Sequence, residues 1–387
     1  MNPGTAGEWA GEWGSSGLAY LTGLADGPPD FSRANVLGRA QRIAVDAATL
    51  LTGRAGLLGL TRGGRVSAGG ATRLLAARDG WCAVTLSRPD DVVAVPALLQ
   101  VDEAADDPWP QLQRWAAPRP LAEIVERAAL LDIPTAALGE ATASPPRVRR
   151  LGPRVPPHSA AGLLVVDLTS MWAGPLCGHL LARAGATVVK VESPARVDGT
   201  RAGHRDFFDW INAGKLSYCL DFDREADGLR DLLEVADVVI EGSRPEALAR
   251  RRLGPGQVAP RAGRVWLRVT GHGEDSRRPA FGDDAAVAGG LVGVGPVFCA
   301  DAIADPLAGL EANLAVTESL RRGGGELIVV SMAAVAATYA ALPLQAATST
   351  QSAPRPTAPP VVKVAAGLGA DNAEVRRLVA ERRCVSC

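Results

Sequence analysis

The sequence has few of the side chains that bind metal ions or form disulfides. Its 387 residues include four histidines and six cysteines, the latter at positions 82, 177, 219, 299, 384 and 387. Neither set has the spacing of a zinc site or a disulfide framework, and the terminal pair Cys384 and Cys387 has no second pair to complement it. We therefore expect no bound metal and interpret the spacing of Cys384 and Cys387 as accidental. We also expect the thiols to be reduced, as in a cytoplasmic protein.

Several other protein classes also find no support in the sequence. Apolar runs are interrupted well short of a membrane-spanning length, and the N-terminus has neither the basic leader nor the apolar segment of a signal peptide. A net charge of −1 gives no reason to expect nucleic acid or a membrane surface as a partner. A G-x-S-x-G elbow, a Walker loop and the glycine pattern of a dinucleotide site are absent.

Residues 1–142 indicate a small α+β domain. Its first 35 residues are rich in glycine and proline and predict a segment that wraps a surface. Apolar periodicity then predicts a long helix over residues 36–61. Further on, the pattern predicts a hairpin whose strands are residues 73–76 and 81–86. It also predicts a helix over residues 121–131 and a last strand over residues 133–138.

Residues 143–160 carry five prolines without a hydrophobic period, which predicts a stiff linker. Strands and helices alternate throughout residues 161–345, and this pattern is typical of a doubly wound, Rossmann-like parallel sheet. The predicted strands are 163–166, 187–191, 216–220, 237–240, 264–270 and 327–330. Residues 346–387 predict a tether and a charged C-terminal helix. The fold class is therefore α/β with a smaller α+β domain.

The most informative stretch is one predicted βαβ unit, residues 163–192. A buried strand ends before a turn with glycine, and Pro175 suits the start of the following helix. Such turns lie at the carboxyl edge of the sheet, where open α/β folds bind ligands. Three segments there can hold an anionic ligand: the Thr169–Pro175 turn, the Lys190–Arg201 loop and the Asn212–Lys215 turn. Spacing alone leaves it equally open that Lys190 and Arg201 are solvated loop residues.

Three aspartates farther along the chain are candidates for chemistry. Asp305 directly precedes Pro306, which favours a helix N-cap, although a carboxylate held ionised there also suits a nucleophile. Asp283 and Asp284 are adjacent and favour the start of another helix. On residue type alone, the capping interpretation is preferred for all three.

Ordered motifs over residues 163–345 resemble CoA-transferase family III, the CaiB/BaiF group. They read VVDLTSMWAGP with ARAGATVVKVE, then INAGKLSYCLD, ADVVIEGSRPEAL, RVTGHGEDS and ADPLAGLEANL. In this family the aspartate of A-D-x-x-[AG]-G attacks the acyl-CoA thioester, a mixed anhydride forms, and CoA is held as thiolate while an acceptor acid is exchanged in. The resemblance therefore implies Asp305 as nucleophile. By motif match, the CoA site would be lined by Ser170, Ala173, Gly174, Pro175, Lys190, Arg201, Asn212, Lys215 and Arg244.

The N-terminal third resembles the small domain of the same family, but in a different position in the chain. ATRLLAARDGWCAVTL and LLDIPTAAL are similar to segments that follow the central helices in other members. The resemblance thus implies a rearranged member whose small domain stands first. It also implies a homodimer, since members of the family form interlocked dimers, together with acyl-CoA and carboxylic acid substrates.

Two alternatives to CoA transfer stay open. The family also contains α-methylacyl-CoA racemases, which use a histidine in a G-H-D context, and the matching position here is Asp283. A carboxylate can also move a proton, so this departure disfavours racemisation without excluding it. A catalytically impaired CoA-binding protein is the third interpretation, and the aspartate at position 305 argues weakly against it.

Overall fold

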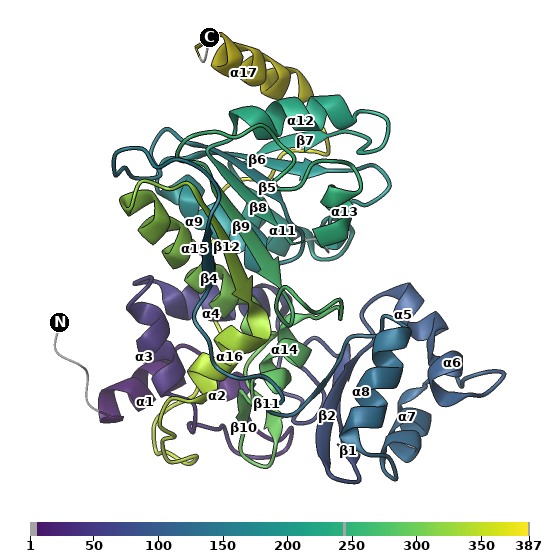
Figure 1. Ribbon diagram of the computed structural model, residues 1–387. Coiled ribbons are helices and arrows are strands. Elements are labelled where there is room, and N and C mark those ends of the chain that lie inside the picture. The colour runs from purple at the N-terminus through teal and green to yellow at the C-terminus, as the bar shows by residue number, and fades with distance from the viewer. Residues whose placement is uncertain (1–5, 243–244, 386–387) are drawn as a thin grey trace. The chain divides into compact units, whose positions relative to one another are not determined.

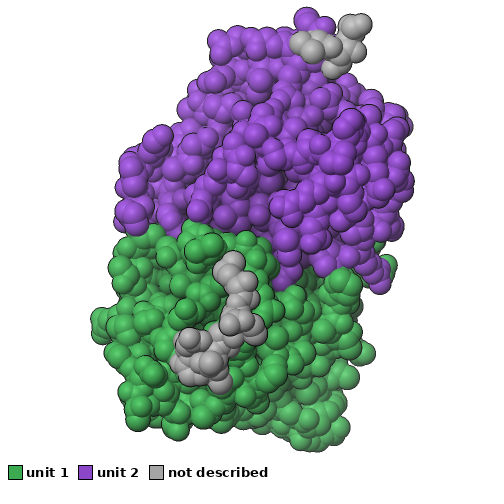
Figure 2. All heavy atoms as spheres, turned by 90° about the vertical axis from the view of Figure 1, so that its left-hand side faces the viewer, with its two compact units in different colours: residues 1–145, 271–307, 331–359 green, residues 146–270, 308–330, 360–387 purple. Residues whose placement is uncertain are grey.

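The computed structural model describes residues 6–242 and 245–385, and these divide into two compact units. Figure 2 colours them separately: unit 1 comprises residues 1–145, 271–307 and 331–359, and unit 2 comprises 146–270, 308–330 and 360–387. The first boundary falls inside the predicted linker. The later boundaries differ from the predicted domain of 161–345, because unit 1 recruits two segments through long-range packing that local periodicity does not report.

Unit 2 is built on a seven-stranded sheet of order β4-β12-β9-β8-β5-β6-β7 (Figure 1). Its strands are β4 (Arg147–Arg150), β5 (Leu164–Leu168), β6 (Thr187–Glu192), β7 (Leu216–Cys219), β8 (Val238–Glu241), β9 (Val265–Thr270) and β12 (Glu326–Ser331). Neighbouring strands from β9 to β7 pair in parallel, and β4 is antiparallel to β12. The predicted α/β class with a mostly parallel sheet is confirmed.

Strand β4 lies within the segment predicted as a linker, and that part of the prediction is wrong. Its backbone pairs with β12, with Arg150 opposite Glu326 and Arg147 opposite Val329. All four side chains of β4 are exposed, so the strand leaves no apolar alternation in the sequence. A strand that contributes only its backbone to an edge is invisible to hydrophobic patterning.

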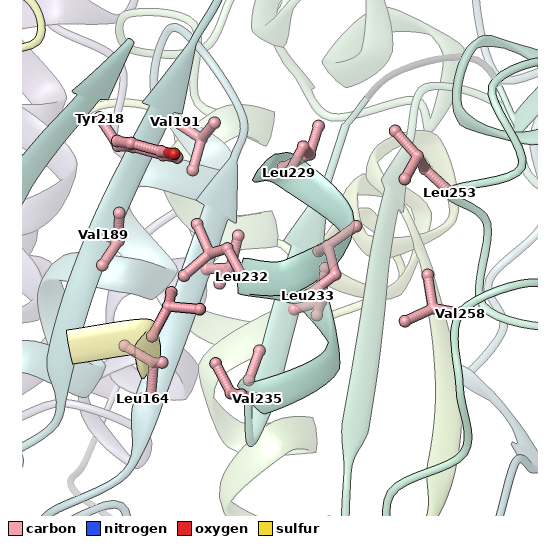
Figure 3. Close-up of a cluster of buried hydrophobic side chains, with 14 of the residues drawn as sticks. Leu164, Val189, Val191, Tyr218, Leu229, Leu232, Leu233, Val235, Leu253 and Val258 are labelled. Carbon is pink, nitrogen blue, oxygen red and sulfur yellow. The ribbon is translucent and has the colours of Figure 1, made fainter. Parts of the chain in front are cut away.

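One face of the sheet in unit 2 carries the main apolar core. Alternate residues of the strands, such as Leu164, Val166 and Val189, pack with leucines of α12 (Ala226–Val235). Figure 3 shows Leu229, Leu232 and Leu233 of α12 among these strand side chains. Val375 and Val379 of the C-terminal helix α17 (Asn372–Val385) join the same cluster. The predicted C-terminal helix is therefore part of the core of this unit.

Helix α9 (Ala173–Arg183) lies on the opposite face of the sheet. There it contacts α15 (Ala304–Arg321) through the portion of α15 that belongs to unit 2, where a Cβ on Gly309 would lie 2.7 Å from the Ala173 carbonyl oxygen. The remaining helices of unit 2 are α10 (Gly199–Ala202), α11 (Arg205–Asn212) and α13 (Pro245–Ala249). Helix α9 thus covers the residues of β5 and β6 that point away from the main core.

Unit 1 contains a three-stranded antiparallel sheet covered on both faces. Strands β1 (Thr72–Ala77), β2 (Gly80–Thr85) and β3 (Thr135–Ala137) confirm the predicted hairpin and last strand. One face packs against helices α6 to α8, and the other packs against α14, β10 and β11. These elements are α6 (Val95–Leu99), α7 (Trp109–Ala116), α8 (Leu121–Leu130), α14 (Gly282–Ala288), β10 (Val292–Gly293) and β11 (Val297–Phe298), and the short helix α5 (Pro89–Val93) precedes α6.

The helices of the N-terminal segment complete unit 1 together with α16 (Met332–Ala340). They are α1 (Ala6–Ser15), α2 (Leu18–Leu21), α3 (Asn35–Gln41) and α4 (Ala47–Leu58). The long helix predicted over 36–61 is two helices, because the chain leaves helical geometry between Arg42 and Asp46. None of the helices within the described residues combines the length and the hydropathy needed to cross a bilayer.

Candidate functional site

The first candidate cluster lies in unit 2, beneath helix α9. Asp167 of β5 and Lys190 of β6 are register partners, and both side chains point to the face that α9 covers. Lys215, directly before β7, donates from Nζ to Asp167 Oδ2 at 2.9 Å and to Asn212 Oδ1 at 2.9 Å. A Cβ on Gly178 would stand 3.0 Å from Asp167 Oδ2 and 3.3 Å from Lys215 Nζ, so the glycine lets α9 approach the ion pair.

Lys190 forms a second buried ion pair, with a residue of the loop after β6. Its Nζ donates to Asp198 Oδ2 at 2.8 Å and to the Thr169 carbonyl oxygen at 2.9 Å. In turn, Asp198 accepts hydrogen bonds from Thr200 at the start of α10. Lys190 is 1% exposed, and the alternative that it is a solvated loop residue is therefore wrong.

Arg201 ties the same loop to the carboxyl end of β6. Its guanidinium donates to both oxygens of Glu192, at 2.9 Å and 2.6 Å, and to the Ala366 carbonyl oxygen at 3.0 Å. It also stacks over the Phe208 ring at 4.2 Å from the ring centroid. Its side chain is 10% exposed, so Arg201 is not a solvated loop residue either.

The structure brings four of the predicted CoA-site residues to one small depression. It is lined by Lys190, Arg201, Asn212 and Lys215, together with residues of β7 and residues 365–366. The depression contains about 150 Å³ of empty space. This volume includes open solvent and leaves no room for a water molecule, so the depression is not a formed ligand pocket.

The start of α9 gathers the other predicted residues. Ala173, Gly174 and Pro175 are buried, Ser170 is exposed, and Lys215 Nζ donates to the Pro175 carbonyl oxygen at 2.8 Å. A Cβ on Gly174 would lie 2.3 Å from Thr169 Oγ1, which explains the glycine. Pro175 is the third residue of the helix instead of the predicted first. Predicted residue Arg244 lies outside the described residues.

Sequence reasoning did not single out the acidic partners of this cluster, Asp167, Glu192 and Asp198. Burial alone would raise the pKa of Asp167, but Lys215, Lys190 and the Thr169 hydroxyl together hold it below its ordinary value. Burial alone would also raise the pKa of Asp198, but Lys190 and Thr200 lower it. The available signal was a charged residue near the carboxyl end of each buried strand, where the sheet brings such residues together.

The second candidate cluster lies in unit 1 and contains Asp305. Helix α15 begins at Ala304, so Asp305 is in its first turn and not at the predicted N-cap. The Asp305 amide donates to the Ala302 carbonyl oxygen at 2.9 Å. Directly before it, Ala300 and Ala302 have φ of 56° and 42°, values that are common for glycine and rare for alanine. Each such residue costs on the order of 1–3 kcal/mol, so surrounding contacts must hold this turn.

Asp283 and Asp284 lie in the first turn of helix α14, as predicted, where Asp284 is buried and Asp283 is half-buried. Asp283 Oδ1 accepts the Ala302 amide at 2.9 Å. Asp284 Oδ1 accepts the Thr85 hydroxyl at 2.9 Å and the Phe281 amide at 3.0 Å. Burial raises the pKa of Asp283 to about 6, aided by Asp301, and burial raises the pKa of Asp284 to about 7.

Arg54 of α4 is the cation that faces this group of carboxylates. Its Nη1 donates to Asp301 Oδ1 at 2.5 Å, and Asp301 is fully buried. Burial alone would lower the pKa of Arg54, but Asp301, Asp283 and Asp305 together raise it. Several carboxylates therefore share this arginine. In residues 6–242 and 245–385, no group of histidine, cysteine, aspartate or glutamate has an arrangement that could hold a metal ion.

Curated proteins similar to this chain are CoA-transferases. The chain is 32% identical over 146 residues to the succinyl-CoA–L-malate CoA-transferase β subunit of Chloroflexus aurantiacus, covering 34% of this chain and 36% of that protein. It is 28% identical over 201 residues to the succinyl-CoA–D-citramalate CoA-transferase of the same organism, covering 46% and 50%. The chain thus spans half or less of the length of these relatives.

Solved structures and a family model were compared as well. A CaiB/BaiF family protein from Brucella suis is 27% identical, with a TM-score of 0.43 and coverage of 48% of this chain and 56% of that chain. The model that matches residues 161–366, more than half of the sequence, is that of CoA-transferase family III. This chain belongs to CoA-transferase family III.

Proposed function

We propose that this protein transfers coenzyme A between an acyl-CoA thioester and a carboxylic acid, with Asp305 as the nucleophile. The observation that carries the proposal is the family match over residues 161–366. Asp305 enters it through the sequence ADPLAG, which resembles the family's A-D-x-x-[AG]-G motif. Its placement in the first turn of α15 supports the role, because the N-terminal end of a helix favours a negative charge.

The proposed reaction begins when an Asp305 carboxylate oxygen attacks the thioester carbonyl carbon. The C–S bond breaks, a mixed anhydride forms, and CoA leaves as thiolate. The thiolate then attacks the aspartyl carbonyl carbon, which releases the donor acid and leaves an aspartyl-CoA thioester. The acceptor carboxylate attacks that thioester and forms a second anhydride. Finally the thiolate attacks the acceptor acyl carbon, giving a new acyl-CoA and the original aspartate.

The proposed CoA site comprises Ser170, Ala173, Gly174, Pro175 and the residues of the small depression, with Arg244 included on the family motif alone. Its support is twofold. The first turn of α9 carries no acidic side chain, so its N–H groups can face an anion. The buried pairs Lys190–Asp198 and Lys215–Asp167 fix the loops around that turn. These lysines therefore shape the site through their partners.

Three further statements belong to the same proposal. The small domain stands before the sheet domain in this chain, which is supported by a family match that begins only at residue 161. The protein is a homodimer, as the family resemblance implies. It acts in the cytoplasm, and the free thiols of Cys82, Cys177, Cys219, Cys299 and Cys384 fit that compartment.

One observation favours a second candidate, racemisation at the α-carbon of an acyl-CoA. Asp283 stands where the racemases of this family carry histidine, and burial raises its pKa to about 6. A carboxyl group that titrates near neutral pH can take up and return a proton. We rank this function second because the curated relatives named above are CoA-transferases.

A panel of acyl-CoA thioesters tests both functions, beginning with succinyl-CoA because two relatives are named for it. Transfer predicts CoA exchange that depends on an added acid, and hydroxylamine that traps an adduct on Asp305. Racemisation predicts deuterium uptake at the α-carbon without CoA exchange. A CoA-dependent rise in melting temperature without either activity would indicate a binding protein.

Two variants make the test specific to Asp305. Asp305→Ala removes the proposed nucleophile and should abolish exchange. Asp227→Ala is the matched control, because Asp227 also lies in the first turn of a helix, α12, and is exposed. Transfer that survives in Asp305→Ala would show that the central assignment is wrong.

A further inference from the structure

The segment that leads to Asp305 is held by N-terminal residues that lie outside the family match. Arg33 donates from Nε to the Val292 carbonyl oxygen at 2.7 Å. The Val294 amide donates to Asp30 Oδ2 at 2.7 Å, and the Phe298 amide donates to the Gly64 carbonyl oxygen at 2.9 Å. The β10–β11 hairpin is therefore attached to residues 30–64 along its whole length.

The same attachment continues into the turn over residues 299–303, directly before α15. The Ala300 amide donates to Thr22 Oγ1 at 3.0 Å, and Thr22 is fully buried. Asp301 pairs with Arg54 at 2.5 Å, and the Ala302 amide is bonded by Asp283. Two residues of this turn have positive φ without being glycine. Contacts of this kind are what keep such a conformation populated.

We propose that Thr22 and Arg54, which the family match does not include, are positioning residues that set the placement of Asp305 by holding the turn 299–303. This inference rests on the proposed role of Asp305. Thr22 fixes the backbone at Ala300, and Arg54 fixes Asp301 one residue later. Because the Asp305 amide bonds the Ala302 carbonyl oxygen, the geometry of this turn determines where α15 and its first-turn carboxylate begin.

The two residues act in different physical ways. The Thr22 hydroxyl supplies a single acceptor for a backbone amide, while it donates to the Leu18 carbonyl oxygen at 2.9 Å. Arg54 supplies a positive charge that pairs directly with Asp301, and Asp301, Asp283 and Asp305 together raise its pKa. Loss of Thr22 should therefore loosen the turn, whereas loss of Arg54 should also change the charge balance around Asp305.

The test compares Thr22→Val, which has the same shape without the hydroxyl, with Thr22→Ser, which keeps the hydroxyl. Arg54→Met removes the charge and Arg54→Lys keeps it. Two controls match them: Thr52→Val, whose hydroxyl bonds within its own helix, and Arg119→Met, whose guanidinium pairs with Glu123 at similar exposure. Because Arg54→Met leaves Asp301 buried beside other carboxyls, the double variant Arg54→Met/Asp301→Asn covers the case in which the single variant fails to fold.

Three quantities are measured in each variant: CoA affinity by calorimetry, the single-turnover rate of the hydroxylamine-trapped adduct on Asp305, and hydrogen exchange of the Ala300 and Ala302 amides. We expect Thr22→Val and Arg54→Met, or the double variant in its place, to slow adduct formation about 10- to 100-fold with CoA affinity nearly unchanged. Hydrogen exchange of the Ala300 amide should accelerate in Thr22→Val. The conservative variants Thr22→Ser and Arg54→Lys should recover most of the wild-type rate of adduct formation.

The outcomes separate this inference from the proposed function. A wild-type adduct together with unchanged rates in Thr22→Val and in the Arg54 variants would overturn the positioning roles and leave the function standing. Absence of any wild-type adduct would overturn the function. Hydrogen exchange would then still test whether Thr22 and Arg54 hold the turn. Unchanged hydrogen exchange of the Ala300 and Ala302 amides in the variants would refute the positioning roles as well.

Discussion

The two units each bury a group of charged residues, but the charges are balanced in unit 2, whereas carboxylates outnumber the cation in unit 1. In unit 2, Lys190 and Lys215 each have a buried aspartate, and the pKa of both aspartates is lowered. In unit 1, Arg54 faces several carboxylates, and the pKa of Asp283 and Asp284 is raised. A balanced group keeps fixed charges and so fixes a shape, whereas burial of carboxylates, aided by neighbouring carboxylates, leaves groups that exchange protons near neutral pH.

This difference separates two tasks that the sequence alone did not distinguish. The lysines of unit 2 were predicted to line a CoA site, and the structure shows them employed in internal pairs. Their contribution to a ligand is therefore the shape of the loops that they hold. Two carboxylates of unit 1, Asp283 and Asp301, lie near the same arginine, Arg54, as the residue proposed to react. Four variants and measurements sharpen this comparison.

The largest effect is expected from breaking a balanced pair in unit 2. Lys215→Met leaves Asp167 buried beside α9 without its closest cation, which should lower the free energy of unfolding by about 3–5 kcal/mol. The free energy of unfolding is measured by urea unfolding, with circular dichroism as the signal. Arg251→Met, which breaks the exposed pair with Asp223, is the control and should leave the midpoint unchanged. Equal midpoints for the two variants would show that the buried pair is not structural.

A pH-dependent effect is expected in unit 1 at Asp284, whose pKa is raised to about 7. The unfolded chain releases this proton near its ordinary pKa of 3.8, and the folded chain keeps it until about pH 7. Wild-type stability from this group therefore falls as the pH rises from about 4 to about 7. Asp284→Asn does not titrate, so its stability relative to wild type should rise across that window by a few kcal/mol, on the order of 1.4 per pKa unit.

The measurement for Asp284 is urea unfolding of both proteins at several pH values. Asp106→Asn, at an exposed position of the same unit, is the control, and its difference from wild type should not change across the window. A difference between Asp284→Asn and wild type that is constant from pH 4 to 8 would contradict the protonated state assigned to Asp284.

A smaller effect is expected at Gly178, where α9 approaches the Asp167–Lys215 pair. Gly178→Ala places a methyl group 3.0 Å from Asp167 Oδ2 and should destabilise the protein by about 1–3 kcal/mol. Gly228→Ala in α12 meets only ordinary contacts, the nearest at 3.4 Å, and should be neutral or stabilising by about 0.5–1 kcal/mol. Thermal unfolding compares them, and the opposite order would contradict the described packing.

Local patterning predicted the elements that bury an apolar face. The apolar runs of β5 and β6 gave the positions of these strands to within a residue or two, because each strand packs one face against the main core. Patterning failed where the backbone alone contributes, as at β4, and where a helix is interrupted, as between α3 and α4. Neither feature leaves an apolar period in the sequence.

The candidate site was predictable only in part, for a related reason. The family motifs identified Asp305 and the lysines as candidates. They did not indicate that Asp301 pairs with Arg54, 247 residues away, or that Thr22 bonds the Ala300 amide. Those contacts join segments of unit 1 that are far apart in the chain, and neither spacing nor residue type shows which of many polar residues will meet.

The fourth measurement tests the central claim, that Asp305 forms an anhydride with the acceptor acid. The enzyme is incubated with an acyl-CoA and an acceptor labelled with oxygen-18 in its carboxylate, and the peptide around Asp305 is analysed by mass spectrometry. In the proposed reaction the bridging oxygen comes from the acceptor and stays on Asp305 when the thiolate attacks the acceptor acyl carbon. We predict labelled Asp305 in every preparation that exchanges CoA. Sustained CoA exchange with unlabelled Asp305 would contradict the proposal.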